Sequence, residues 1–203
     1  MPFNLQPNPA IITGVILLGI VPLVLWNIGL QRENRRLKTL TLMDSLTSLP
    51  NRRGFELLIQ KAIREARRSN QPLSMLLLNL DSFSNVNQDY GFDIGDALLE
   101  RIAHQLREAQ PHANIPCRWS GDEFIILLKD VGHVAAQWSA EKMRAQVERE
   151  LFRIDDRSLH ITVSLGTATL NETDDHTSVI QRAHLSLLNA KQSGGNICCS
   201  IQE

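Results

Sequence analysis

The chain has 203 residues, and its 21 Lys and Arg are balanced by 22 Asp and Glu, for a formal charge of −1. Hydrophobic residues make up 43% and charged residues 21% of the sequence, which is typical of a globular protein and excludes a wholly disordered one. Because the charge is balanced, nothing favours sequence-independent binding to nucleic acid, and we expect no nucleic-acid partner. Three cysteines exclude a disulfide framework, so Cys117, Cys198 and Cys199 are expected to be reduced.

The first feature along the chain is an uncharged segment, residues 11–30, with the sequence IITGVILLGIVPLVLWNIGL. About 20 apolar residues in a helix span the hydrocarbon core of a bilayer, which is roughly 30 Å thick. Trp26 lies near one end, where an indole ring favours the level of the lipid headgroups. The segment therefore predicts one transmembrane helix.

The flanks of this segment differ in charge. Residues 1–10 carry no charged side chain, whereas residues 31–38 carry three Arg and one Lys against one Glu. A cleaved signal peptide needs a basic start and a small-residue cleavage site, and both are missing, so a permanent anchor is favoured. The positive-inside rule then makes residues 1–10 a short extracytoplasmic tail and places the chain after residue 30 in the cytoplasm, with residues 31–43 as a helical connector.

From residue 44 onward the sequence alternates between helical and extended patterns. Pro50-Asn51 marks a turn, and Asn51 is expected to cap the helix that follows. Further elements are predicted in this order: strand Leu73–Leu80, helix Ala97–Ala109, a hairpin over Cys117–Leu128, helix Ala135–Leu151, strand Leu159–Leu170, helix Val179–Lys191 and strand Ile197–Ile201. The pattern favours an α/β domain with one partly antiparallel sheet covered by helices. Trp119 and Trp138 are expected in its core.

Two predicted loops are rich in oxygen ligands. The hairpin turn carries Gly121, Asp122 and Glu123, and the loop after Leu80 carries several acids, including Asp81 and Asp96. Converging carboxylates at the ends of strands suit Mg²⁺ bound to phosphates. Acidic turns are more often solvated caps, so loop chemistry by itself leaves both interpretations open.

Five motifs resemble those of one family. Residues 44–53 (DSLTSLPNRR) resemble its DxLTxLPNRR opening, residues 79–96 (NLDSFSNVNQDYGFDIGD) its DxDxFKxxNDxxGHxxGD segment, and residues 118–124 (RWSGDEF) its signature. Residues 163–166 (VSLG) and 190–194 (AKQSG) match later elements. The matches run in order over about four-fifths of the chain, and the sequence thereby resembles the GGDEF domains of diguanylate cyclases.

The resemblance implies a palm-like, ferredoxin-related nucleotide cyclase fold with a central, mostly antiparallel sheet over residues 44–203. Cyclases of this family join two GTP molecules into cyclic di-GMP and two diphosphates, with Mg²⁺ or Mn²⁺ and with two subunits facing each other. The sequence is thus interpreted as a bacterial signalling protein of the inner membrane whose GGDEF domain lies in the cytoplasm.

The resemblance also assigns the candidate site residues. Asn87 and Asp96 match the residues that bind guanine, and Asp122 and Glu123 match the catalytic acids of the signature. Substrate contacts are also expected from Phe83, Ser84 and Lys191, and metal contacts from Asp122, Glu123, Asn79 and the backbone of Leu80.

Several positions depart from the family pattern. Asn79 replaces a metal-binding Asp, Ser84 replaces a phosphate-facing Lys, and Gly195 replaces an Arg. Ser120 replaces the first signature glycine, a change that matters only if its φ angle is positive. The expected product-inhibition motif falls at residues 111–114 (PHAN) and lacks both its Arg and its Asp.

These departures leave two classes of function. The favoured one is a GGDEF domain with little or no cyclase activity that binds guanine nucleotide or a protein partner. The alternative is an active cyclase that makes cyclic di-GMP from GTP, and a folded relic is the plainest remaining interpretation. The hypothesis is that the three substitutions Asn79→Asp, Ser84→Lys and Gly195→Arg together would restore turnover.

Overall fold

The computed structural model describes residues 20–27, 42–108 and 114–201. The chain divides into two compact units, Met1–Thr41 and Leu42–Glu203. In the first unit, residues 20–27 are helical and their apolar side chains are exposed. None of the helices in the described ranges is both long and apolar enough to cross a bilayer. Most of the predicted span, residues 11–30, and of the connector, residues 31–43, lies outside those ranges, and both stay predictions.

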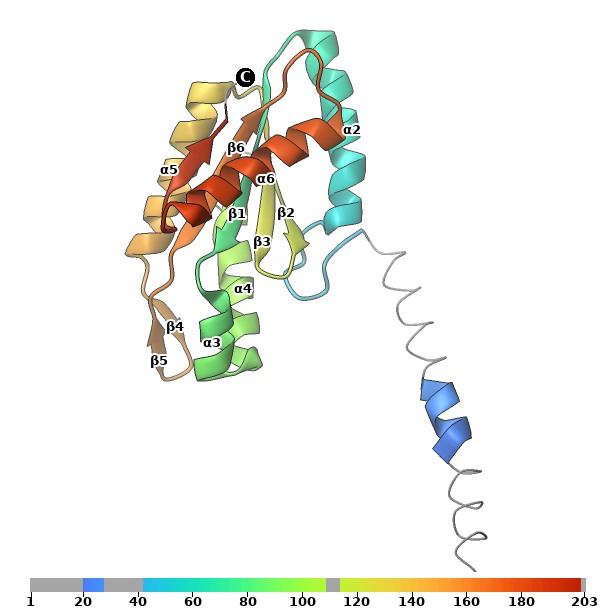
Figure 1. The fold of residues 1–203 in the computed structure, drawn as a ribbon, viewed down its shortest axis with the longest axis vertical. Coiled ribbons are helices and arrows are strands. Elements are labelled where there is room, and N and C mark those ends of the chain that lie inside the picture. The colour runs from blue at the N-terminus through green and yellow to red at the C-terminus, as the bar shows by residue number, and fades with distance from the viewer. Residues whose placement is uncertain (1–19, 28–41, 109–113, 202–203) are drawn as a thin grey trace, which may run out of the picture. The chain divides into compact units, whose positions relative to one another are not determined.

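The second unit alternates helices and strands (Figure 1). Its elements are α2 (Arg52–Ser69), β1 (Leu73–Leu80), α3 (Phe83–Tyr90), α4 (Phe92–Glu108), β2 (Ile115–Ser120), β3 (Glu123–Lys129), α5 (His133–Arg149), β4 (Phe152–Ile154), β5 (Arg157–Leu159), β6 (Val163–Thr169), α6 (His176–Gln192) and β7 (Cys198–Ser200).

One five-stranded sheet has the order β2-β3-β1-β6-β7. Every neighbouring pair is antiparallel except β6 and β7, which are parallel. The mostly antiparallel sheet that the sequence predicts is therefore confirmed. Strands β4 and β5 form a separate two-stranded hairpin.

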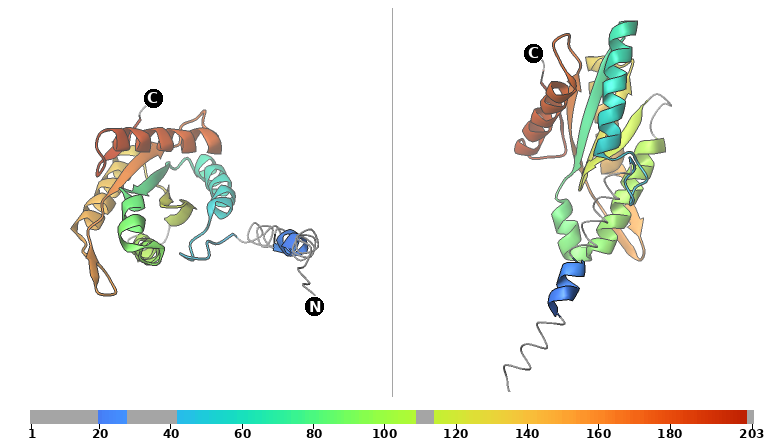
Figure 2. Two further views of the ribbon diagram at one scale, coloured as in Figure 1. Left: turned by 60° about the horizontal axis from the view of Figure 1, so that its bottom comes forward. Right: turned by 90° about the vertical axis from the view of Figure 1, so that its right-hand side faces the viewer.

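Helices cover both faces of this sheet (Figure 2). Successive side chains of a strand point to opposite faces. Leu76 and Leu78 of β1 accordingly pack in a cluster with α4 and α5, whereas Met75 and Leu77 pack with α2 and α6. Burial on both faces explains why β1 is a continuous apolar run rather than an alternating one.

The predicted start of α2 is confirmed, because the Asn51 side chain accepts a hydrogen bond from the Gly54 N–H at 3.0 Å. The predicted strand Leu159–Leu170 is wrong in part: Leu159 ends β5, and β6 begins at Val163. Sequence analysis also missed α3 and the β4–β5 hairpin. Both are short, and their burial depends on neighbours distant in sequence.

The two tryptophans have different environments. Trp119 is 9% exposed and belongs to the core, as predicted. Trp138 is 75% exposed, so its predicted burial is wrong. Helix α5 buries Ala136, Ala140 and Met143. Trp138 lies two residues after Ala136, which at 3.6 residues per turn places it on the opposite side of the helix.

All three cysteines are free, as expected. Burial raises the pKa of the Cys117 thiol to about 12. This thiol is therefore a small apolar core residue rather than a nucleophile.

Candidate active site

The candidate site lies where β1 ends and leads into α3. Asn79 is the register partner of Glu123 on β3. The Leu80 N–H donates a hydrogen bond of 3.3 Å to the carbonyl oxygen of Asp122. The topology thus brings together the four expected metal-binding positions: Asn79, Leu80, Asp122 and Glu123.

The signature turn is held in place by Arg118. Its Nε and Nη2 donate to the Gly121 carbonyl at 3.0 and 2.9 Å, and its Nη1 contacts Asp44 Oδ1 at 3.0 Å. Burial raises the pKa of Asp44, but hydrogen bonds from Thr47 and Arg118 outweigh this effect and hold the pKa below its usual value. Two of the motifs, residues 44–53 and the signature, are therefore one structural unit.

The serine in the signature is accommodated without strain. Ser120 is absent from the residues with positive φ in the described ranges, so the substitution for glycine requires no unfavourable backbone conformation. Its Oγ donates a hydrogen bond of 3.1 Å to Glu123 Oε2. Ser120 therefore gives one of the two signature carboxylates a partner within the protein.

Asp81 is the most heavily bonded acid of the site. Its carboxylate accepts hydrogen bonds from Thr162 Oγ1 at 2.8 Å, from Ser164 Oγ at 2.7 Å and from the Asn196 N–H at 2.9 Å. Burial raises the pKa of Asp81, but hydrogen bonds from Lys191, Ser164 and Thr162 more than compensate, and the pKa lies below its usual value. Asp81 is therefore a fixed negative charge at neutral pH.

Lys191 reaches this acid from the last turn of α6. Its Nζ lies 2.7 Å from Asp81 Oδ1 and donates a longer hydrogen bond, of 3.3 Å, to the Leu80 carbonyl. The ammonium thus contacts the carbonyl that the resemblance assigns to a metal ion.

One of the two expected guanine contacts, Asn87, lies against the start of α4, the helix that carries the other, Asp96. A Cβ on Gly95 would overlap the Asn87 side-chain oxygen, so the absence of a side chain at Gly95 lets Asn87 lie against α4. Asp96 follows Gly95 directly, and its side chain is exposed. Asn87 is half-buried and Asp96 is exposed, and an amide and a carboxylate are groups that can bind the edge of a planar base.

The first turn of α3 follows directly after Asp81 in the chain. Ser82 has a left-handed φ of 54° and makes no side-chain capping hydrogen bond. Backbone N–H groups at an uncapped helix start are donors for an anion. Phe83 is half-buried and Ser84 is exposed, so the expected phosphate end has backbone donors but no cation from position 84.

A divalent metal ion fits this donor set poorly. Within the ranges that the structure describes, no group of three or more His, Cys, Asp or Glu is placed to hold a metal. Asn79 supplies an amide instead of a carboxylate, and the Leu80 carbonyl already accepts from an ammonium. Hard divalent cations select anionic oxygen ligands, and a neighbouring positive charge repels them.

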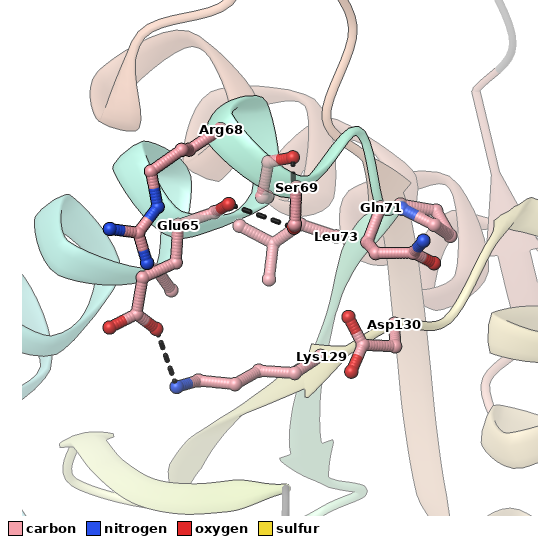
Figure 3. Close-up of a pocket in the computed structure, with 10 residues that line it drawn as sticks. Glu65, Arg68, Ser69, Gln71, Leu73, Lys129 and Asp130 are labelled. Carbon is pink, nitrogen blue, oxygen red and sulfur yellow. Dashed lines mark hydrogen bonds and ion pairs between the residues drawn. The ribbon is translucent and has the colours of Figure 1, made fainter.

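A different cavity, of about 350 Å³, lies between α2 and the end of β3 (Figure 3). Lys129 spans it and pairs with Glu65 at 3.1 Å. Its lining also includes Arg68 and Asp130, so opposite charges balance within it. None of the predicted site residues lines this cavity.

The sequence did not single out Asp81, although its carboxylate accepts more hydrogen bonds than the other acids described here. Asp81 stood out only as one acid among several, and its partners Thr162, Ser164 and Asn196 lie about 80 to 115 residues away. No local pattern marks such contacts. The predicted loss of the product-inhibition motif cannot be compared with the fold, because residues 109–113 lie outside the described ranges.

The sequence profile described as "Diguanylate cyclase, GGDEF domain" matches residues 41–197, more than half of the chain. The chain belongs to the GGDEF family. Diguanylate cyclase A of Treponema denticola is 30% identical over 168 residues, which cover 81% of this chain and 45% of that protein. The response regulator PleD of Caulobacter vibrioides is 32% identical over 160 residues, covering 77% and 35%. The chain thus spans less than half the length of these relatives.

Solved GGDEF structures have the same fold. The GGDEF domain of DgcB from Caulobacter crescentus, in complex with c-di-GMP, aligns with a TM-score of 0.74 at 25% identity over 77% of this chain and 92% of that one. Diguanylate cyclase SiaD from Pseudomonas aeruginosa, in complex with its activator SiaC, aligns with a TM-score of 0.74 at 28% identity over 92% and 72%. The fold expected from the resemblance is therefore confirmed for the GGDEF domain.

Proposed function

We propose that this GGDEF protein acts in bacterial cyclic di-GMP signalling as a guanine-nucleotide-binding module with little or no cyclase activity. The observation that carries the proposal is a contrast within one site. Asn87 and Asp96, which the resemblance assigns to guanine, match the family pattern, whereas the three positions 79, 84 and 195, which it assigns to metal or phosphate, are neutral.

The contrast predicts separate effects on binding and on turnover. A donor aimed at a transition state is worth roughly 3–4 kcal/mol, or about 10²–10³ in rate. Position 79 lacks the carboxylate, and positions 84 and 195 lack the cations, that the family pattern has there. The effects of the three changes on the rate need not add. Hydrogen bonds to the base edge act equally in the ground state, so they support binding without accelerating the reaction.

We further propose that residues 11–30 anchor the protein in the cytoplasmic membrane with the GGDEF domain in the cytoplasm. The uncharged stretch and the basic residues that follow it support this location. A homodimer would be required only for the alternative function, since cyclisation joins two GTP molecules held by two subunits.

The test is calorimetric titration of the full chain in detergent with GTP, GDP and ATP, with chromatography of the GTP reaction for cyclic di-GMP. We expect guanine nucleotides to bind, ATP not to bind, and product to be absent or several orders of magnitude slower to form than in an active family member. Asp96→Ala should weaken GTP and GDP binding by about tenfold or more, because a lost hydrogen bond to a carboxylate is worth about 1.5–3 kcal/mol.

Rapid formation of cyclic di-GMP by the unmodified chain would establish the alternative, an active cyclase. If the chain neither binds guanine nucleotide nor forms product, the result would favour a folded relic or a purely protein-binding role. Glu100→Ala, an exposed acid one turn further along α4, is the matched control for Asp96→Ala and should leave affinity unchanged.

A further inference from the structure

The phosphate end of the site contains a cation of its own. The Lys191 ammonium lies 2.7 Å from Asp81 Oδ1 and 3.3 Å from the Leu80 carbonyl oxygen. An ammonium has three N–H donors. Two are used by these contacts, and the third remains for an oxygen of a bound ligand.

Asp81 holds this ammonium in place. The Asp81 side chain is 15% exposed, and three further donors fix its two oxygens, namely Thr162, Ser164 and the Asn196 N–H. A carboxylate so restrained cannot follow a moving lysine, so Lys191 is directed to one position. Asp81 is a positioning residue in this arrangement, because it acts through Lys191.

The loop that contains Gly195 approaches the Asp81 carboxylate closely. Gly195 has a φ of 77°, and a Cβ there would lie 3.2 Å from Asp81 Oδ1. A glycine permits both the left-handed backbone and the close approach. Of the three expected phosphate-facing positions, 84, 191 and 195, Lys191 is thereby left as the one with a charge.

The same ammonium opposes a second cation. A divalent ion bound to the Leu80 carbonyl would share that oxygen with Lys191 and be repelled by it. Asn79 adds no charge beside that oxygen, and the Asp81 carboxylate already accepts from Lys191, Thr162, Ser164 and the Asn196 N–H. Glu123 accepts a hydrogen bond from Ser120, so Asp122 is the remaining acid of the expected metal set.

We propose that the site around Lys191 binds the phosphates of a guanine nucleotide without a divalent cation. Lys191, which the resemblance already assigns to the substrate, is then the cation of this site, and the N–H groups that begin α3 are further donors. The proposal rests on the proposed guanine-nucleotide binding and specifies its ionic requirement. Metal-independent binding is consistent with a module that senses nucleotide without processing it.

The test is calorimetric titration of the full chain in detergent with GDP and with GTP, once in EDTA and once in Mg²⁺. We expect the dissociation constants in the two buffers to agree within about threefold. Lys191→Met should weaken binding by about tenfold or more in both buffers, because it removes a charge-assisted contact. Lys191→Arg should retain most of the affinity.

Three further variants sharpen the result. Lys61→Met removes an exposed lysine of α2 and should leave affinity unchanged. Asp81→Asn should weaken binding as Lys191→Met does, although residue 81 does not contact the ligand. Asn79→Asp should introduce a dependence on Mg²⁺ that the unmodified chain lacks. Thermal melting of each variant checks that it is folded.

The outcomes separate this proposal from the one on which it rests. Binding in Mg²⁺ that falls by more than about tenfold in EDTA would overturn metal-independent binding and leave guanine-nucleotide binding intact. A folded Lys191→Met protein with unchanged affinity would also overturn it. Absence of binding in both buffers would overturn both proposals.

Discussion

At the scale of single residues, the site differs from the family pattern in charge far more than in shape. Asn79 remains in the strand ladder opposite Glu123, and Ser84 remains at the start of α3. Restoring the charges at these two positions requires no change of backbone. Gly195 is different, because its φ of 77° is unfavourable for any residue with a side chain.

We therefore expect the double variant Asn79→Asp and Ser84→Lys to raise cyclase activity by about 10² or more, since each restored charge acts on the transition state. Cyclic di-GMP formed from GTP and Mg²⁺ and quantified by chromatography is the measurement. A folded, nucleotide-binding double variant that stays inactive would contradict our explanation of the proposed low activity.

The third change of the restoration hypothesis, Gly195→Arg, should instead lower the free energy of unfolding by about 1–2 kcal/mol through backbone strain. Gly195→Ala is its matched control, because alanine has the same strain without the charge. Urea denaturation of the two variants should therefore give similar losses. If arginine alone stabilises the domain, its charge outweighs the strain and the loop can adapt.

At the scale of elements, the signature hairpin depends on a segment far away in sequence. Arg118 in β2 joins the Gly121 carbonyl to Asp44, and the Arg118 N–H donates to the Pro50 carbonyl at 2.9 Å. The residues before α2 thus support the turn that carries Asp122. This support explains in structural terms why residues 44–53 form one of the motifs.

We expect Arg118→Ala to lower the free energy of unfolding by about 1–3 kcal/mol, because it removes the side-chain donor of the Gly121 carbonyl and the cation that pairs with the half-buried Asp44 carboxylate. Urea denaturation of the full chain in detergent measures this. Arg64→Ala, which removes an exposed arginine of α2, is the control and should change stability by less than about 0.5 kcal/mol. Equal effects of the two substitutions would contradict the supporting role of Arg118.

At the scale of the whole molecule, the chain joins an apolar N-terminal segment to a GGDEF domain that has its own two-sided core. Charge is balanced over the whole sequence but not along it, since the basic residues 31–38 follow directly after the uncharged stretch. This asymmetry is the argument for membrane anchoring with a cytoplasmic domain.

We expect the full chain to sediment with membranes and to resist alkaline carbonate extraction, because twenty uncharged residues bury enough apolar surface for stable insertion. Fusion of a reporter to the C-terminus should show a cytoplasmic location. Replacing Leu17, Leu18 and Leu23 by Asp should release the protein into the soluble fraction. Release of the unmodified chain by carbonate would contradict the anchor.

The amount that sequence could predict follows from how local each feature is. The strand Leu73–Leu80, the cap at Asn51 and the hairpin over the signature depend on neighbours in sequence, and all three were predicted correctly. The burial of Trp138 was predicted wrongly, because which side of a helix meets the core depends on packing.

The sequence by itself determined the family, the fold and the positions at which residue charge differs from the family motifs, because each is carried by residue identity at fixed spacing. The tertiary structure alone decided where the remaining charges lie. It placed Lys191 on both Asp81 and the Leu80 carbonyl, a contact across about 110 residues. Such a contact arises when the end of α6 packs beside the end of β1, and no local pattern in the chain encodes it.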